Sequence, residues 1–163
     1  MIGPLLNPVK LDYQLVGVFD PELTSTFADI LGKLGRKRAW AVHGKGPNNE
    51  GMDELSLCSE TKISKWDSNE VNEFSIRPEN FDLSPCTLDD LKGGDPKENA
   101  AIINSILSNK GDGPKRDIIA LNAAAGFVVT GIASDIGNGL EIAQRCIKDG
   151  TAMAKLDSLR NFR

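Results

Sequence analysis

The chain has 163 residues, of which 40% are hydrophobic and 26% are charged, and its formal net charge is -4. This length can bury the core of one domain, and the balance of residue types is typical of a globular protein. No apolar run is long enough to cross a bilayer, and the first residues lack the basic and apolar regions of a secretory signal. We therefore expect one domain with no membrane partner.

Cysteine and basic residues exclude further classes of protein. Cys58, Cys86 and Cys146 have no C-x-x-C spacing, which argues against a disulfide framework or a zinc site and favours a reducing compartment. The only dense basic cluster spans residues 33–38. It is interpreted as the positively charged end of a helix rather than as a contact for nucleic acid, so no nucleic-acid partner is expected.

The first third of the chain predicts a β-α-β unit. Residues 15–19 and 39–42 are apolar and rich in β-forming types, and residues 23–34 carry apolar side chains at helical spacing. Asp20 is expected to cap this helix, with Pro21 in its first position. A right-handed crossover would make the two strands parallel.

The next segment alternates between polar and apolar residues. Residues 62–66 and 71–76 predict an antiparallel hairpin whose turn is 67–70. The fold class is therefore expected to be α/β, with a mixed, mostly parallel sheet that contains an antiparallel hairpin and is flanked by helices.

From Thr87 onward the pattern is helical. Two helices have start signals in the sequence. One signal is Thr87 with Asp90, and the other is Asp95 with Pro96 and Glu98. Further helices are expected over 117–130, from about 135 to a stop at Gly150, and over 151–159.

A glycine-rich loop at residues 44–51 follows a predicted buried strand that ends at His43, and it leads to Asp53 and Glu54. Ligands of open α/β sheets bind beyond the carboxyl ends of parallel strands, and Mg²⁺ prefers one or two carboxylates completed by waters and phosphates. The residues alone still favour a solvated acidic turn over a metal site. His43 alone is more typical of a hydrogen-bonding strap than of a catalyst.

For two other motifs, a structural role is favoured over a role in binding or catalysis. Gly93-Gly94-Asp95-Pro96 could bind an anion at a helix start, but helix punctuation is favoured because Asp95 would repel a phosphate. Asn122 lies within a helix that is apolar nearly all round, and a buried amide usually bonds to backbone groups.

In combination, these motifs resemble the anthranilate phosphoribosyltransferase family, within the glycosyltransferase family 3 and nucleoside phosphorylase-like superfamily. The motifs that carry the resemblance follow one order along the whole chain: Gly3-Pro4-Leu5-Leu6-Asn7-Pro8, Gln14 to Val18, His43-Gly44 to Gly51-Met52-Asp53-Glu54, Leu91 to Pro96, and Leu121 to Ala124. The family's metal-binding pair falls on Asp53 and Glu54. The loop between Gly44 and Gly51 is longer than the family pattern, with an insertion at 47–49.

The resemblance implies a transferase of tryptophan biosynthesis. It would join anthranilate to 5-phosphoribosyl 1-diphosphate with Mg²⁺. The family's diphosphate loop, its Lys-His-Gly-Asn segment, its anthranilate-contacting arginine and its helical N-terminal domain all precede the first motif. Residues 1–163 are therefore expected to be the C-terminal α/β domain alone, inactive by itself.

The expected partners follow from the same resemblance. They are 5-phosphoribosyl 1-diphosphate and anthranilate, with a homodimer formed through the N-terminal domain and a cytoplasmic or plastid location. Two alternatives stay open. One is a non-catalytic, nucleic-acid-binding relative of the same fold, and the other is part of a pyrimidine-nucleoside phosphorylase.

Overall fold

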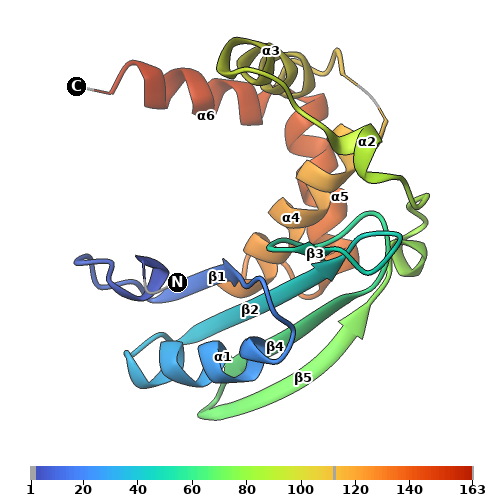
Figure 1. The fold of residues 1–163 in the computed structure, drawn as a ribbon. Coiled ribbons are helices and arrows are strands. Elements are labelled where there is room, and N and C mark those ends of the chain that lie inside the picture. Colours follow the sequence, from blue (N-terminus) through green and yellow to red (C-terminus); the bar gives the residue numbers. More distant parts are fainter. Residues whose placement is uncertain (1–2, 112, 163) are drawn as a thin grey trace.

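The computed structural model describes residues 3–111 and 113–162; residues 1, 2, 112 and 163 of the expected domain lie outside this description. A single sheet has helices on both faces (Figure 1). The strands are β1 (Tyr13–Gly17), β2 (Arg38–Lys45), β3 (Gly51–Met52), β4 (Thr61–Asp67) and β5 (Glu70–Ile76). The helices are α1 (Leu23–Lys33), α2 (Leu88–Leu91), α3 (Pro96–Leu107), α4 (Pro114–Thr130), α5 (Ile136–Lys148) and α6 (Thr151–Arg160), with short 3-10 turns η1 (Gly3–Leu5) and η2 (Pro78–Phe81).

The sheet is mixed, as expected, but it is not mostly parallel. Its order is β1-β2-β4-β5, and β3 pairs with β2. Only β1 and β2 are parallel among the described strands, whereas β2–β3, β2–β4 and β4–β5 are antiparallel. The expected share of parallel strands was wrong because, among the described helices, only α1 crosses over between two paired strands.

The predicted β-α-β unit and hairpin are both confirmed. The crossover consists of β1, α1 and β2, and the hairpin consists of β4 and β5. Ser68 and Asn69 form the hairpin turn with φ angles of 53° and 67°. Two positive φ angles are typical of the turn that matches the twist of adjacent strands.

Two apolar cores lie on opposite faces of the sheet. Ala39 and Ala41 of β2 pack with α1, while Trp40 and Val42 pack with α4 and α5 on the other face. This division follows from the alternation of side chains along a strand. The nearly all-apolar sequence of α4 agrees with its position between the sheet and α5 (Figure 1).

Most of the predicted helix starts are confirmed. Thr87 and Asp90 form a reciprocal capping box, and the Asp95 side chain accepts a hydrogen bond from the Glu98 N–H at 2.8 Å. The expected start of α1 was early by two residues. Asp20 accepts from the Glu22 N–H at 2.9 Å and so caps the turn that precedes Leu23.

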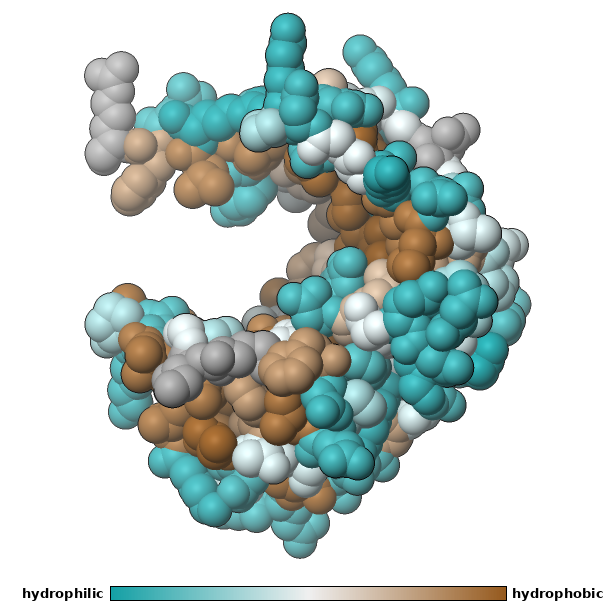
Figure 2. All heavy atoms as spheres, in the orientation of Figure 1, coloured by the Kyte–Doolittle hydropathy of each residue, from teal (hydrophilic) through white to brown (hydrophobic). Residues whose placement is uncertain are grey.

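The molecule has an open, curved outline in which η1 and β1 face α3 and α6 across a gap (Figure 1). In the space-filling view, hydrophobic residues form much of the inner wall of this hollow (Figure 2). Large hydrophobic side chains with at least 62% exposure are Leu6, Val9, Phe19, Ile132, Leu159 and Phe162. Within residues 3–111 and 113–162, none of the helices has the length and apolar character that a membrane span requires.

Candidate functional site

Asp53 and Glu54 project from a loop whose next residues are buried. Both acids follow β3 directly and are exposed to solvent. Residues 55–58 are buried, and Leu55 and Leu57 have no exposed surface. An exposed acid pair next to a buried anchor has a defined position, because the anchor fixes the backbone from which the pair extends.

Two glycines allow this loop to cross the ends of β1 and β2. A Cβ atom on Gly17, the last residue of β1, would lie 1.5 Å from the Asp53 carbonyl oxygen. A Cβ atom on Gly44 of β2 would lie 2.5 Å from the Glu54 carbonyl oxygen. Only residues without a side chain permit such close approaches. The acid pair therefore lies at the carboxyl ends of the parallel strands β1 and β2, where α/β sheets bind ligands.

Hydrogen bonds hold the buried anchor from three sides. The Asn122 amide of α4 accepts from the Leu55 N–H at 2.9 Å and donates to the Leu55 carbonyl at 3.0 Å. The Ser56 hydroxyl donates to the carbonyl of Lys45 in β2 at 2.6 Å, and the Ser56 N–H donates to the Thr61 hydroxyl of β4 at 2.8 Å. The structural role expected for Asn122 is confirmed.

His43 fixes the end of the neighbouring strand rather than contacting solvent. Its side chain is buried, and its Nδ1 lies 2.8 Å from the Val18 carbonyl oxygen, to which it donates. The Val18 N–H donates to the Val42 carbonyl at 2.9 Å, which extends the pairing of β1 with β2. The strap role favoured for His43 is confirmed.

The electrostatics of the acid pair favour a cation. Displacement of water from around its carboxyl raises the pKa of Glu54, and the negative charge of Asp53 raises it further. Two neighbouring carboxylates oppose each other's ionisation, and a bound cation relieves that repulsion.

The donor set fits one class of metal. Within the described residues, no group of three or more histidine, cysteine or acidic side chains is arranged to hold a metal ion. Asp53 and Glu54 thus offer two carboxylates at most. This set suits Mg²⁺, which keeps several waters and takes phosphate oxygens, and does not suit a structural zinc ion.

The Gly93-Gly94-Asp95-Pro96 motif is a junction between helices, as favoured above. The Asn99 amide accepts from the Gly94 N–H at 2.9 Å and donates to the Gly94 carbonyl at 3.0 Å. Gly93 and Asn99 line a hollow of about 200 Å³ together with Lys115 and Ile118 of α4. The junction therefore contacts the first turns of α4, whereas the acid-pair loop is bound further along, at Asn122. The clamp by Asn99 gave no signal in the sequence.

The basic residues at 33–38 do not act as one group. Lys33 lies in the last turn of α1, as interpreted, but Arg38 belongs to β2. Arg36 is buried and donates to the Gln14 side chain at 3.0 Å, and Lys37 pairs with Asp12 at 3.0 Å. The cluster therefore joins the starts of β1 and β2, in addition to ending a helix.

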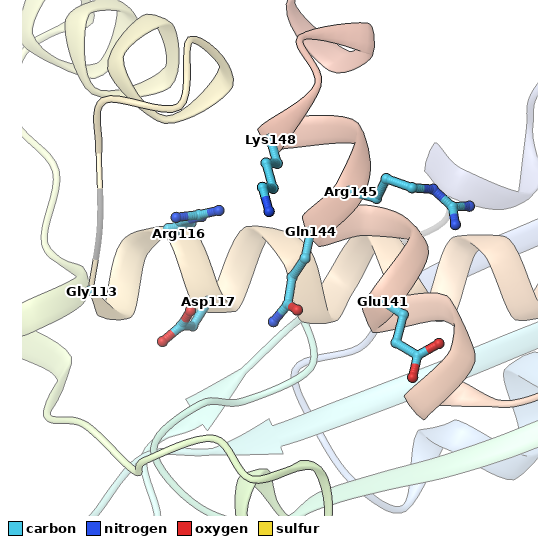
Figure 3. Close-up of a pocket in the computed structure, with 7 residues that line it drawn as sticks. All are labelled: Gly113, Arg116, Asp117, Glu141, Gln144, Arg145 and Lys148. Atoms are coloured by element: carbon cyan, nitrogen blue, oxygen red, sulfur yellow. The ribbon is translucent and has the colours of Figure 1, made fainter.

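A second hollow, of about 580 Å³, lies between α4 and α5, and sequence reasoning missed it (Figure 3). Arg116 and Lys148 point into it, while Arg145 extends away from them. Asp117 and Glu141 also line it, and burial raises the pKa of Asp117. Charges of both signs share this hollow, so it favours neither anions nor cations.

Comparison with known proteins identifies the family of this chain. Residues 1–153 match the family described as glycosyl transferase family, a/b domain. The chain is 41% identical over 162 residues to the anthranilate phosphoribosyltransferase of Desulfatibacillum aliphaticivorans, covering 99% of this chain and 46% of that protein. The enzyme of the same name from Geobacter sulfurreducens is 42% identical over 159 residues, with 98% and 44% covered. The chain thus spans about half the length of the curated relatives it matches.

Solved structures agree in fold. The crystal structure of anthranilate phosphoribosyltransferase from Thermus thermophilus has a TM-score of 0.86 at 35% identity, covering 96% of this chain and 45% of that one. The Saccharomyces cerevisiae enzyme in complex with PRPP and Mg has a TM-score of 0.83 at 27% identity, with 96% and 44% covered. The resemblance read from the sequence motifs is confirmed, and this chain belongs to the glycosyl transferase family, whose a/b domain it matches over nearly its entire length.

Proposed function

We propose that this chain is the C-terminal α/β part of an anthranilate phosphoribosyltransferase. The whole enzyme would transfer the phosphoribosyl group of 5-phosphoribosyl 1-diphosphate to anthranilate in tryptophan biosynthesis. The proposal is supported by relatives of that name, which this chain matches over 99% of its own length and 46% of theirs. It is also supported by yeast homologues solved with PRPP and Mg and with 4-fluoroanthranilate.

The observation that carries the proposal is the placement of the acid pair. Asp53 and Glu54 lie at the carboxyl ends of β1 and β2, on a backbone fixed by Asn122. In our proposal they hold Mg²⁺, with phosphate oxygens of the sugar substrate and waters completing the ion's ligands. When bound, Mg²⁺ would neutralise negative charge on the departing diphosphate. The residues of this chain keep the two carboxylates oriented toward the substrate.

The remaining parts of the site are assigned to the rest of the enzyme. By the family resemblance, the diphosphate loop, the anthranilate contacts and the dimer interface of a homodimer belong to segments outside residues 1–163. The isolated chain is therefore proposed to have no transferase activity, because both substrates must be positioned together. Its three free cysteines support a reducing compartment such as the cytoplasm.

A chimera tests the proposal. This chain would replace the matching segment of the Desulfatibacillum aliphaticivorans enzyme, and formation of phosphoribosylanthranilate would be followed across Mg²⁺ and sugar-diphosphate concentrations. We expect Mg²⁺-dependent turnover by the chimera and none by the isolated chain. A folded chimera without turnover would contradict the proposed activity.

The acid pair is tested in the same chimera. Changing Asp53→Asn together with Glu54→Gln should lower kcat/KM for the sugar diphosphate by roughly 100-fold, since loss of ligands weakens a metal site at least as much as loss of their supporting partners. The KM for anthranilate should change little. Glu22→Gln, an exposed acid at the start of α1, is the matched control and should behave as the unchanged chimera. Undiminished turnover of the double variant would rule out the metal role.

A further inference from the structure

Two cysteines that are distant in sequence meet next to the acid-pair loop. The Sγ atoms of Cys58 and Cys86 are 3.7 Å apart although the residues are 28 positions apart in the chain. Both thiols are free. Cys58 is buried at the end of the anchored segment 55–58, and Cys86 is partly exposed in the stretch between η2 and α2.

The backbone around these thiols is suited to a covalent link. The Cys86 N–H donates to the Leu57 carbonyl at 3.2 Å, so the two chain segments are already adjacent. The Cys58 N–H donates to the Ser56 hydroxyl at 2.9 Å and keeps Cys58 in place. A disulfide requires the sulfurs to approach to about 2.05 Å. Ser84 and Pro85 before Cys86 are exposed, so this segment can make the small shift.

We propose that Cys58 and Cys86 are a reversible thiol–disulfide site that responds to low-molecular-weight disulfides. The more exposed thiol, Cys86, loses its proton and attacks one sulfur of the small disulfide, which releases one thiol and leaves a mixed disulfide. Cys58 then attacks the Cys86 sulfur, the Sγ–Sγ bond forms, and the second small thiol leaves. The two cysteines are oxidised, the small disulfide is reduced to two thiols, and their protons come from the cysteines.

The link would join two functional parts of the fold. Cys58 lies four residues after Glu54, and Cys86 directly precedes Thr87, which caps α2. The bond would enclose the hairpin of β4 and β5 and fix the acid-pair loop to the segment that leads to the glycine junction. Burial and the contact with Cys58 raise the pKa of Cys86 to about 12, so little of this thiol is ionised near neutral pH and the exchange is slow.

The test uses the whole chain with an excess of oxidised glutathione. After alkylation of the remaining thiols, intact mass and peptide mapping should show that the chain has lost two alkylatable thiols together, with the Cys58 and Cys86 peptides linked. The melting temperature should rise by about 5 °C and fall back when dithiothreitol is added. A non-reducing gel should show a monomer.

Three variants isolate the pair. Cys58→Ser should stop at a glutathione adduct on Cys86, and Cys86→Ser should form no link. Cys146→Ser, which changes a partly exposed cysteine of α5, should behave as the unchanged chain. Stable glutathione adducts on the unchanged chain without a Cys58–Cys86 peptide would overturn the proposal, as would a link that involves Cys146 or joins two chains. These readouts on the unchanged chain hold even if Cys58→Ser fails to fold.

Discussion

Asn122 holds Leu55 by both of its backbone groups, across 67 residues of sequence. The amide oxygen accepts from the Leu55 N–H and the amide nitrogen donates to the Leu55 carbonyl, while the same nitrogen donates to the Ile118 carbonyl at 3.0 Å. One side chain thereby joins α4 to the residue that follows Glu54. The position of the acid pair depends on this helix as much as on the strands.

Replacing Asn122 should therefore destabilise the whole chain. Asn122→Leu keeps the branching and the number of side-chain heavy atoms but leaves the N–H and carbonyl of the fully buried Leu55 without the partners that Asn122 supplies. We expect the free energy of unfolding to fall by roughly 2–6 kcal/mol, since two buried groups are left unsatisfied and each costs about 1–3 kcal/mol. Urea denaturation measures this loss. Asn161→Ala, an exposed amide after α6, should change stability by less than about 0.5 kcal/mol. Similar losses in both variants would contradict the role given to Asn122.

The close approach at Gly17 predicts a second, specific sensitivity. Gly17→Ala should lower the free energy of unfolding by about 1–3 kcal/mol, because the new Cβ would overlap the Asp53 carbonyl and force the loop away. Gly126→Ala is the matched control. It lies within α4 with nothing within 4 Å of its Cβ position, so alanine should stabilise the chain by about 1 kcal/mol. Thermal denaturation of the two variants should give shifts of opposite sign, and a neutral Gly17→Ala would show that the loop does not need this contact.

Glu54 should make the stability of the chain depend on pH. Its pKa lies above the ordinary value of 4.5 because of lost hydration and the Asp53 charge, so its ionisation costs more in the folded chain than in the unfolded chain. The resulting penalty is absent below pH 4.5 and develops as the pH rises through the folded pKa. Glu54→Gln should match the unchanged chain in acid and be more stable than it near neutral pH. Denaturation curves across that range measure the difference.

Glu73 provides the opposite case. Hydrogen bonds from Ser64 and Lys62 lower the pKa of Glu73, so its contribution stabilises the fold above the ordinary value of 4.5 and is lost as the pH falls through the folded pKa. Glu73→Gln should therefore be less stable than the unchanged chain near neutral pH and equal to it in acid. If the two variants show pH dependences of the same sign, the account of at least one of the two groups is wrong.

The isolated chain should associate with itself. β1 is an end strand of the sheet, and exposed side chains such as Phe19 and Leu159 face solvent at 62% and 70% exposure. Apolar surface of this extent tends to find a partner. Sedimentation velocity over a concentration series should show growing assemblies, and Phe19→Ser with Leu159→Ser should weaken them. A single monomeric species at every concentration would refute this expectation.

The sequence predicted those features that depend on nearby residues. The caps at Thr87 and Asp95 are formed by partners three residues away, and the hairpin turn by adjacent residues with positive φ. The acid pair was identified from the order of motifs along the chain. Its place beyond the parallel strands followed from the rule for α/β sheets, and the geometry agrees with that rule.

Features that depend on distant residues gave no such signal. The partner of Asn122 could not be read from a pattern, and Cys58 and Cys86 looked unrelated at 28 residues apart. The prediction overestimated the share of parallel strands. The pattern of hydrophobic residues is the same whether β2 pairs with the later strands in a parallel or in an antiparallel direction. Helix α4 begins at Pro114 rather than near Asp117, since Gly113 turns the chain with a φ of 71°.

The loop that carries Asp53 and Glu54 is positioned without help from those two side chains. Gly17 and Gly44 approach its carbonyl oxygens, and Asn122 binds the backbone of Leu55. The side chains at positions 53 and 54 can therefore be exchanged without changing the fold of the loop. Other side chains at these two positions would alter which ligand the loop binds, on a scaffold that does not have to be rebuilt.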